Sequence, residues 1–304
     1  MAIEFWRNTV KRRLLILLCA ALCVCMPLIF FNHWRVDAAD SHLRPPLDMF
    51  ERGPYRAIAE QQWRTSDRRI PAPAIVPYVR PEFARQMRDL RPAILAAAAR
   101  HNHPDLSGMN NHDFAVLIAQ LMYNEHFGWF EERVTPVQLI TPIYEGLQRE
   151  TNQTGMSDLS VWPANIRPSV AVQILRGQVP LPHSTAMMTV PLEVYGSTID
   201  VHTYDTTQEL YAAVSHEIAT PELAVEYLAA NLERGLYRAK VEGVVVTWRA
   251  LAAWHNQGIV SPSELRKNAT ASDYVHRASA YVQTARTLID TPPPPVPAWK
   301  FAIE

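Results

Sequence analysis

An uncharged apolar run near the N-terminus is the feature that most constrains how this chain can fold. The run extends from Leu14 to Phe31, and its length of about 18 residues is just enough for a helix that crosses a bilayer. The basic residues that precede it are Arg7, Lys11, Arg12 and Arg13. Positive charge on this side predicts a cytoplasmic N-terminus. We therefore expect residues 1–34 to form a cytoplasmic tip and one transmembrane helix, with the rest of the chain exported.

A cleaved signal peptide is the alternative interpretation of the same run. Val36, Asp37 and Ala38 precede Ala39 and offer a small-residue cleavage site. The run is long for the apolar core of a signal peptide, however, and this site lies several residues beyond its end. The sequence therefore favours an uncleaved anchor over a removed leader.

The cysteines, glycines and charges of the chain exclude several classes of protein. All three cysteines lie inside the apolar run, so disulfides and cysteine-based zinc sites are excluded from the exported part. Only 10 glycines stand against 24 prolines, and no Gly-rich phosphate loop occurs. A doubly wound domain with a nucleotide cofactor is therefore not expected. The formal net charge of −1 gives no overall basic field, which argues against nucleic acid as a partner.

Changes in periodicity divide the exported part into three segments. Residues 35–80 are rich in proline and arginine, and we expect them to form a tether with one short helix near 54–64. Residues 81–290 carry apolar residues at helical spacing and form the predicted domain. Residues 291–304 begin with a polyproline sequence and form the predicted tail.

The predicted domain is mainly α, with a minor β element. Its apolar spacing predicts helices over Pro81–His101, Asp113–Glu125, Pro136–Glu150, a short stretch from Pro168, 206–217, 221–235, 240–255 and 272–289. Between residues 186 and 204 the helical rhythm breaks. Alternation from Leu192 to Val201 predicts a small hairpin around Gly196 and Ser197.

The predicted helix Asp113–Glu125 carries a carboxylate on its apolar stripe. Apolar residues recur at helical spacing from Phe114 onward, and Glu125 continues the same stripe. A carboxyl held against apolar neighbours loses hydration, which raises its pKa and lets it keep a proton for donation near neutral pH. The alternative is that the helix frays at Tyr123 and Asn124, so that Glu125 faces water.

Two later motifs follow this helix, and their order resembles that of a known family. One motif, from Trp162 to Ala171, reads Trp-Pro-Ala-Asn-Ile-Arg-Pro-Ser-Val-Ala, and the other, from Ala250 to Gly258, reads Ala-Leu-Ala-Ala-Trp-His-Asn-Gln-Gly. The arrangement resembles the lysozyme-like lytic transglycosylases, which cleave peptidoglycan glycan strands. Those enzymes carry a catalytic Glu, usually followed by Ser, at a helix end. A Gly-Leu-Met-Gln-Val-x-Pro-x-Thr-Ala segment comes next, and an Ala-Leu-Ala-Ala-Tyr-Asn-x-Gly segment later.

The matches to these family segments are partial. In the first segment Pro168 and Ala171 match outright, and Asn165 falls on the Gln. In the second, Ala250–Ala253 match, and after one extra residue the sequence from His255 to Gly258 falls on Tyr-Asn-x-Gly. The resemblance covers residues 110 to 270, and its weight comes from the order of the motifs.

Three departures from the family pattern alter the expected cleft. Glu125 is followed by His126 rather than by Ser, and Trp162 replaces the Gly that lets a sugar approach the backbone. Asn165 is one methylene shorter than the Gln of the family. These departures favour a rival interpretation, a degenerate member that binds glycan or scaffolds an envelope assembly without turnover. A purely helical interaction module is a third interpretation.

The resemblance implies a lysozyme-like α+β fold for residues 81–290 and peptidoglycan as the substrate. It implies that Glu125 donates a proton to the glycosidic oxygen and then takes one from the substrate's own 6-hydroxyl, so that no second carboxylate and no cofactor are needed. It also implies a place in the bacterial inner membrane, with the domain exported to the periplasm or cell-wall side.

Residues near the three motifs are expected to bind the glycan: Asn165, Asn256, Trp162, Tyr123, His126 and His255. Either asparagine can hydrogen-bond an N-acetyl or hydroxyl group, and Asn256 can instead orient Glu125. Capping of a local turn is the alternative for both asparagines. The aromatic side chains can stack on sugar rings, and packing in the core is the alternative for them.

Two other polar clusters are not expected to contribute chemistry. Asp158, Glu131 and Glu132 are the carboxylates near enough in sequence to assist Glu125, and we expect them to be solvated loop residues. The stretch from His101 to His103, with His112, invites a metal-site interpretation. No HExxH or comparable helical spacing supports a metal, so a polar loop is favoured.

Overall fold

The computed structural model describes residues 77–126, 128, 131, 141–244 and 246–291. The predicted anchor, the short helix expected near 54–64 and all but the first residue of the tail lie outside these ranges. Within them, no helix combines the length and the apolar character needed to cross a bilayer.

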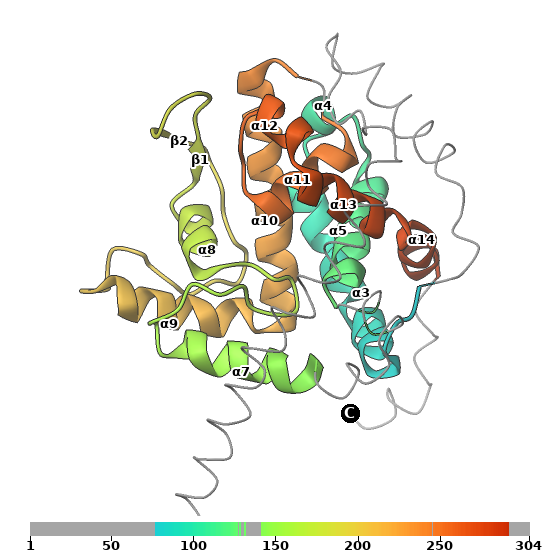
Figure 1. Cartoon of the computed structure of the whole chain (residues 1–304), viewed down its shortest axis with the longest axis horizontal. Helices are drawn as coiled ribbons and strands as arrows, with labels where there is room; N and C mark the ends of the chain where they lie inside the picture. The colour runs from blue at the N-terminus through green and yellow to red at the C-terminus, as the bar shows by residue number, and fades with distance from the viewer. Residues whose placement is uncertain (1–76, 127, 129–130, 132–140, 245, 292–304) are drawn as a thin grey trace, which may run out of the picture. The chain divides into compact units, whose positions relative to one another are not determined.

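The described part of the domain is mainly α-helical with one two-stranded antiparallel sheet, as the apolar spacing predicts (Figure 1). The elements, in chain order, are α3 (Pro81–His101), α4 (Pro104–Ser107), α5 (Asn111–Glu125), α7 (Thr141–Gln153), α8 (Pro168–Leu175), β1 (Gln178–Pro180), β2 (Met187–Thr189), α9 (Thr207–Ile218), α10 (Pro221–Glu242), α11 (Trp248–Gln257), α12 (Pro262–Lys267), α13 (Ala269–Ser279) and α14 (Val282–Asp290).

Local sequence signals explain where several of these helices begin. Proline occupies the first turn of α3, α8, α10 and α12, where its missing N–H costs nothing. The side chain of Asn110 accepts a hydrogen bond from the backbone N–H of Asp113 (2.8 Å) and caps α5. Ser261 and Glu264 form a reciprocal capping box at the start of α12.

Helix α5 lies at the centre of the core. Every residue from Phe114 to Glu125 is buried, and the helix packs against α3, α13 and α14. The long helix α10 packs against α3 on one side and against α8 and α11 on others. The sequence predicted one apolar stripe on α5, but the helix is buried on all its faces, as its apolar sequence allows. Glu125 is therefore buried because the whole helix is buried.

The predicted hairpin around Gly196 is wrong, and the sheet lies earlier in the chain. β1 pairs with β2, with Val179 opposite Met188. In the region of the expected hairpin the backbone forms turns, and its amides bond to carboxylates instead of to a partner strand. The amide of Tyr195 donates to Glu226 (3.3 Å), and that of Thr198 donates to Glu217 (2.8 Å).

Two of the predicted helical ranges are divided in the structure. The range 240–255 is divided, because α10 runs on to Glu242 and ends at Gly243, whose φ of 62° is left-handed, before α11 begins. The range 272–289 is divided between α13 and α14 at Ala280. The helix expected from Pro136 is described from Thr141 as α7, and Pro136 itself lies outside the described residues.

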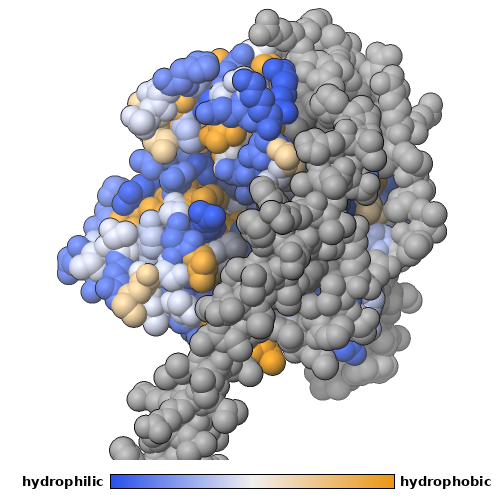
Figure 2. Space-filling view, in the orientation of Figure 1, coloured by the Kyte–Doolittle hydropathy of each residue, from blue (hydrophilic) through white to orange (hydrophobic). Residues whose placement is uncertain are grey.

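The described surface is mixed in character. Figure 2 shows hydrophilic and hydrophobic residues interspersed on the face that it displays, with the hydrophobic ones in small groups. The large hydrophobic side chains with the greatest exposure are Met156, Tyr195 and Ile143, which belong to different parts of the chain. Single exposed hydrophobic side chains of this kind are common on protein surfaces.

Candidate functional site

Glu125 lies at the C-terminal end of α5, where the helix meets a pocket. The pocket has a cavity volume of about 190 Å³ and is lined by residues of four parts of the chain. Glu125 and Asn124 come from α5, Asn165 from the loop before α8, Asn256 from α11, and Tyr274 from α13. The side chain of Glu125 is about one-tenth exposed, so its carboxyl is shielded but can be reached from the pocket.

A second hollow, of about 140 Å³, continues the first toward α8 and α10. The two share four lining residues, Asn165, Arg167, His255 and Asn256, and together we call them the groove. The second hollow adds Arg234 of α10 and Trp254 of α11, among others. The groove therefore runs past Glu125 between the loop before α8 and the end of α11.

Three side chains from separate elements hold the Glu125 carboxyl. The amide Nδ2 of Asn165 donates to Glu125 Oε2 (2.7 Å) and also to the Glu125 backbone carbonyl (3.2 Å). The hydroxyl of Tyr274 donates to Oε1. The Nε2 atom of His255 lies 3.4 Å from the same oxygen. Both carboxyl oxygens thus face donors, an arrangement that stabilises the ionised form.

The pKa of Glu125 lies below its ordinary value, which is opposite to the direction predicted from the sequence. Burial raises this pKa, as the apolar stripe implied. Hydrogen bonds from His255, Tyr274 and Asn165 lower it, as does the electrostatic effect that His255 exerts when its ring is charged, and together these effects outweigh burial. The sequence prediction was wrong because it counted the desolvation of the carboxyl and not the donors that converge on it from distant parts of the chain.

The loop before α8 has a defined shape that brings Asn165 to Glu125. An isolated bridge pairs Val161 with Ile166, and both side chains are buried. Between them Asn165 adopts a φ of 49°, in the left-handed region that asparagine tolerates better than most residues. The motif matched to the family's Gln segment therefore serves as a tight turn that delivers one amide to the carboxyl.

His255 and Asn256 take different positions at the end of α11. His255 is 2% exposed at its side chain and touches Glu125, as described above. Asn256 is exposed and lines both hollows, and its side-chain oxygen accepts from Gln257. Among the hydrogen bonds of the described residues, none joins Asn256 to Glu125, so its place suits contact with a ligand better than orientation of the carboxyl.

Tyr123, His126 and Trp162 lie away from the groove and pack around Phe83 of α3. The His126 ring stacks on Phe83 (4.8 Å between centroids), and Tyr123 meets it edge-on (6.0 Å). Trp162 lies 5.8 Å from the same ring. Burial lowers the pKa of His126 to about 4 and raises that of Tyr123 to about 12. Tyr123 and His126 are buried and Trp162 is half-buried, so packing, the alternative weighed for the aromatic side chains, describes these three positions.

The other carboxylates that the sequence offered do not line the groove. Asp158 accepts hydrogen bonds from the amide (2.8 Å) and hydroxyl (2.6 Å) of Ser169 and so fastens the loop to the start of α8. Glu131 is buried beside Arg80, at 3.7 Å, rather than solvated as expected. Glu132 lies outside the described residues. Among the described residues, Glu125 is the one carboxylate that lines the groove.

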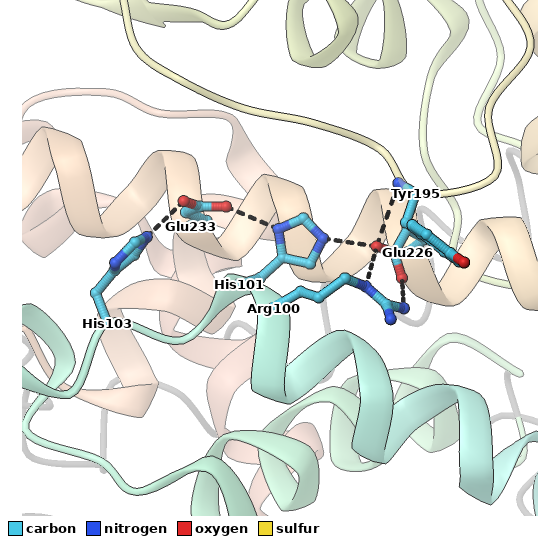
Figure 3. A network of polar contacts seen from close by, with 6 residues as sticks. All are labelled: Arg100, His101, His103, Tyr195, Glu226 and Glu233. Atoms are coloured by element: carbon cyan, nitrogen blue, oxygen red, sulfur yellow. Dashed lines mark hydrogen bonds and ion pairs between the residues drawn. The ribbon is translucent and has the colours of Figure 1, made fainter.

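The histidine-rich stretch spans the end of α3 and the loop that follows it, and its side chains belong to an ion-pair network (Figure 3). His101, the last residue of α3, is buried between two carboxylates of α10, with Nε2 2.9 Å from Glu226 and Nδ1 2.7 Å from Glu233. Arg100 forms two hydrogen bonds to Glu226, and His103 contacts Glu233. Within the described ranges no group of three or more histidine, cysteine or acidic side chains suits a metal ion.

Tyr274 and Arg234 are site residues that the sequence did not single out. Tyr274 lies at ordinary helical spacing in α13, where an aromatic residue predicts core packing. Arg234 lies inside the long apolar pattern of α10 and resembles any surface arginine in the sequence. Neither belongs to a motif, and only the folded chain brings them to the groove.

Comparison of this chain with protein-family models, curated proteins and solved structures finds no match.

Proposed function

We propose that this chain is a glycan-cleaving enzyme of the lytic transglycosylase type, built on a lysozyme-like α+β domain, with Glu125 as both acid and base. The observation that carries the proposal is that Glu125 is the one carboxylate lining the groove among the described residues. Hydrolysis with two carboxylates needs a second acidic group across the scissile bond. Transglycosylation within the substrate needs one.

The arrangement of the three sequence motifs supports the same proposal. Glu125, Asn165 and Asn256 come from segments more than a hundred residues apart at their extremes, and all three line one groove. Asn165 holds the carboxyl, and Asn256 is exposed toward the open space. One chemical group is thus held rigidly and another is left available for a polar substrate.

The proposed reaction uses the carboxyl twice and returns it to its starting state. Protonated Glu125 gives its proton to the glycosidic oxygen as the bond from that oxygen to the anomeric carbon breaks. The carboxylate then takes the proton of the sugar's 6-hydroxyl, whose oxygen forms a new bond to the anomeric carbon. The products are a 1,6-anhydro sugar and a shortened strand with a free hydroxyl, and no water is consumed.

The hydrogen bonds around Glu125 define a pH dependence for this reaction. The acid step needs the protonated carboxyl, and the donors that lower the pKa of Glu125 favour the ionised form. The rate should therefore rise as the pH falls toward that pKa. A profile of this kind suits an enzyme that works on the acidic side of neutrality.

The proposed function includes a place for the domain relative to the membrane. The apolar run and the basic residues before it support a single-pass anchor in the bacterial inner membrane, with the domain on the periplasmic or cell-wall side. Peptidoglycan strands are then the polymer within reach of the groove.

A second candidate function, glycan binding without cleavage, is favoured by one observation. Both oxygens of the Glu125 carboxyl face donors of the protein itself, and these donors stabilise its ionised state. Such a carboxylate can anchor sugar hydroxyls while holding no proton to donate. In this second candidate function the groove binds the glycan, and Glu125 donates no proton to it.

The two candidates separate in one experiment on the purified full-length protein in detergent. Purified murein is incubated with the wild type, with Glu125→Gln and with Glu150→Gln, an exposed control that removes the same charge. Cleavage predicts 1,6-anhydro muropeptides from the wild type and from the control, and none from Glu125→Gln. Sedimentation with murein in the absence of any released product would support binding alone. A wild type that neither binds nor cleaves murein would refute both candidates.

A further inference from the structure

A chain of hydrogen bonds connects a buried arginine on α10 to the Glu125 carboxyl. It begins at Arg234, whose side chain lies among Gln173, Gln178 and Asn231. It continues through Asn231 to His255, and it ends where His255 meets Glu125. The guanidinium of Arg234 can only donate hydrogen bonds, and the carboxylate of Glu125 can only accept them. The side chains between them, Asn231 and His255, can do both. The direction of every hydrogen bond can therefore be worked out from the arginine outward.

The guanidinium of Arg234 fixes the amide of Asn231. Arg234 is 2% exposed, and it donates from Nε to the Gln178 carbonyl (2.8 Å), from Nη2 to Gln173 Oε1 (2.7 Å) and from Nη1 to Asn231 Oδ1 (2.9 Å). A guanidinium has no acceptor, so the Asn231 atom that faces it must be the oxygen. The NH2 group of Asn231 must then point the other way.

The orientation of Asn231 determines which nitrogen of His255 carries the proton. The Nδ2 atom of Asn231 lies 3.3 Å from His255 Nδ1. An amide NH2 group only donates, so Nδ1 must present its lone pair. The single ring proton then resides on Nε2, which lies 3.4 Å from Glu125 Oε1. The tautomer of a histidine is commonly set in this way, by the partner of its other nitrogen.

We propose that Asn231 and Arg234 are positioning residues that hold His255 in its neutral form with the proton on Nε2, directed at Glu125. A doubly protonated ring would place an N–H of His255 against an N–H of Asn231, with no acceptor between them. The cationic charge of Arg234 behind Asn231 opposes a second positive charge at the same place. The group that favours a charged ring is the Glu125 carboxylate, and the hydroxyl of Tyr274 already donates to the oxygen that His255 faces.

The arrangement has a consequence for the chemistry, and this step rests on the proposed function. A charged His255 would form an ion pair with Glu125 and would oppose its protonation. The electrostatic lowering of the Glu125 pKa by His255 requires a charged ring. A neutral His255 donates one hydrogen bond without that charge, so that Glu125 can still take up the proton that the acid step requires. Arg234 is suited to the distant end of the chain of hydrogen bonds. The three oxygens to which it donates are neutral, and burial lowers its pKa to about 10 while leaving it charged at neutral pH.

The tautomer can be measured without any assay of activity. In full-length protein labelled with 15N at histidine, long-range 1H–15N spectra distinguish a protonated ring nitrogen from a bare one, and His255→Gln identifies the His255 signals. The wild type at neutral pH should show Nε2 protonated and Nδ1 bare. A proton on Nδ1, or on both nitrogens, would overturn the proposal whatever the variants do.

Asn231→Asp provides the matched perturbation, since it replaces the NH2 group with a carboxylate oxygen of similar size. The new acceptor should draw a proton onto Nδ1, so that the ring carries protons on both nitrogens at neutral pH. Asn110→Asp makes the same change at the exposed cap of α5, where aspartate also caps well, and should leave the His255 signals unchanged. An unchanged His255 spectrum in folded Asn231→Asp would contradict the proposal.

Murein cleavage then separates this inference from the proposed function. If the wild type cleaves murein, Asn231→Asp should lower kcat by tenfold or more and shift the pH profile to lower pH, with Asn110→Asp unchanged. If the wild type shows the Nε2 tautomer and cleaves nothing, the proposed function fails and the assignment of the tautomer stands.

Discussion

The hydrogen bond from Tyr274 to Glu125 offers the sharpest test of the site, because it can be removed without changing the size of the side chain. Tyr274→Phe deletes the hydroxyl that donates to Oε1 and keeps the ring, which is buried in α13. The carboxyl retains Asn165 at Oε2 and His255 near Oε1. The substitution therefore weakens the stabilisation of the ionised carboxyl by one donor.

The size of the effect follows from the strength of such a bond. A hydrogen bond to a charged group contributes about 1.5 to 3 kcal/mol. Since about 1.4 kcal/mol corresponds to a factor of ten in a protonation equilibrium, the loss should favour the protonated carboxyl by roughly tenfold to a hundredfold. Burial of the carboxyl, which raises its pKa, is then opposed by fewer donors.

Two measurements report on this change. The 13C signal of the Glu125 carboxyl, followed from pH 3 to 9 in the wild type and in Tyr274→Phe, gives the protonation directly. If murein is cleaved, the pH at which the rate declines should also move upward, by about one to two pH units. The variant would thus gain activity at neutral pH while it loses nothing at acidic pH.

Either of two results would refute the reasoning. Protonation of Glu125 at the same pH in both proteins would show that Tyr274 does not stabilise the carboxylate. Movement to lower pH would show that the hydroxyl accepts a hydrogen bond from a protonated Glu125 instead of donating one. Tyr237→Phe, which removes the hydroxyl of a half-buried tyrosine of α10 that lines neither hollow of the groove, controls for the loss of any tyrosine hydroxyl.

Four further substitutions test the fold and the charges that it buries. Burial lowers the pKa of His101, but its contacts with two carboxylates raise it by more, so that it lies above the ordinary histidine value of 6.5. The contribution of the charged ring to stability is therefore complete below pH 6.5 and is lost as the pH rises through the folded-state pKa. The free energy of unfolding in urea should therefore fall above about pH 6.5 in the wild type and change less in His101→Gln. Gly235→Ala should lower the free energy of unfolding by about 1 to 3 kcal/mol, because the new Cβ would lie 2.7 Å from a methyl group of Leu251. Its control is Gly146→Ala in α7, where the new Cβ meets open space and should raise the free energy of unfolding by up to about 1 kcal/mol. Thermal unfolding measures both changes. Glu125→Gln should lower the free energy of unfolding at pH 7, because the pKa of Glu125 is lowered in the folded protein. The difference from the wild type should shrink as the pH falls through that pKa. A variant that is more stable than the wild type at pH 7 would contradict the lowered pKa.

Much of the helical architecture could be predicted from the sequence, because local signals specify it. Pro81 and Pro168 begin the helices expected to start there, and α5 ends at Glu125 as its apolar pattern predicted. The failures have a physical cause that lies outside the local sequence. Apolar and polar residues alternate over 192–201 as they do in a strand. The backbone amides of Tyr195 and Thr198 nevertheless donate to carboxylates of α10 and α9 instead of to a partner strand. The sequence pattern alone does not show that these carboxylates reach that backbone.

The same limit applies to the candidate site. The motif order predicted that Glu125, Asn165 and Asn256 would line one groove, and they do. The direction of the Glu125 pKa was wrong because Tyr274 and His255 contribute donors that desolvation arguments leave out. Trp162 was expected at the groove and instead packs near Phe83, since an exposed turn and a turn folded back onto α3 look alike in sequence.

Two histidines show why partners, and not local sequence, determine the chemistry of a buried side chain. His101 and His255 each lie near the C-terminal end of a helix, each is followed by asparagine, and each side chain is 2 to 3% exposed. Both ring nitrogens of His101 face carboxylates, which only accept, so both carry protons and the charged ring joins α3 to α10. One nitrogen of His255 faces an amide NH2 group, which only donates, so the ring keeps one proton and stays neutral. Helix α10 supplies the deciding partners in both cases, the carboxylates of Glu226 and Glu233 for His101 and the amide of Asn231 for His255. The same helix therefore builds a structural ion pair at one point and directs a proton toward the proposed catalytic carboxyl at another.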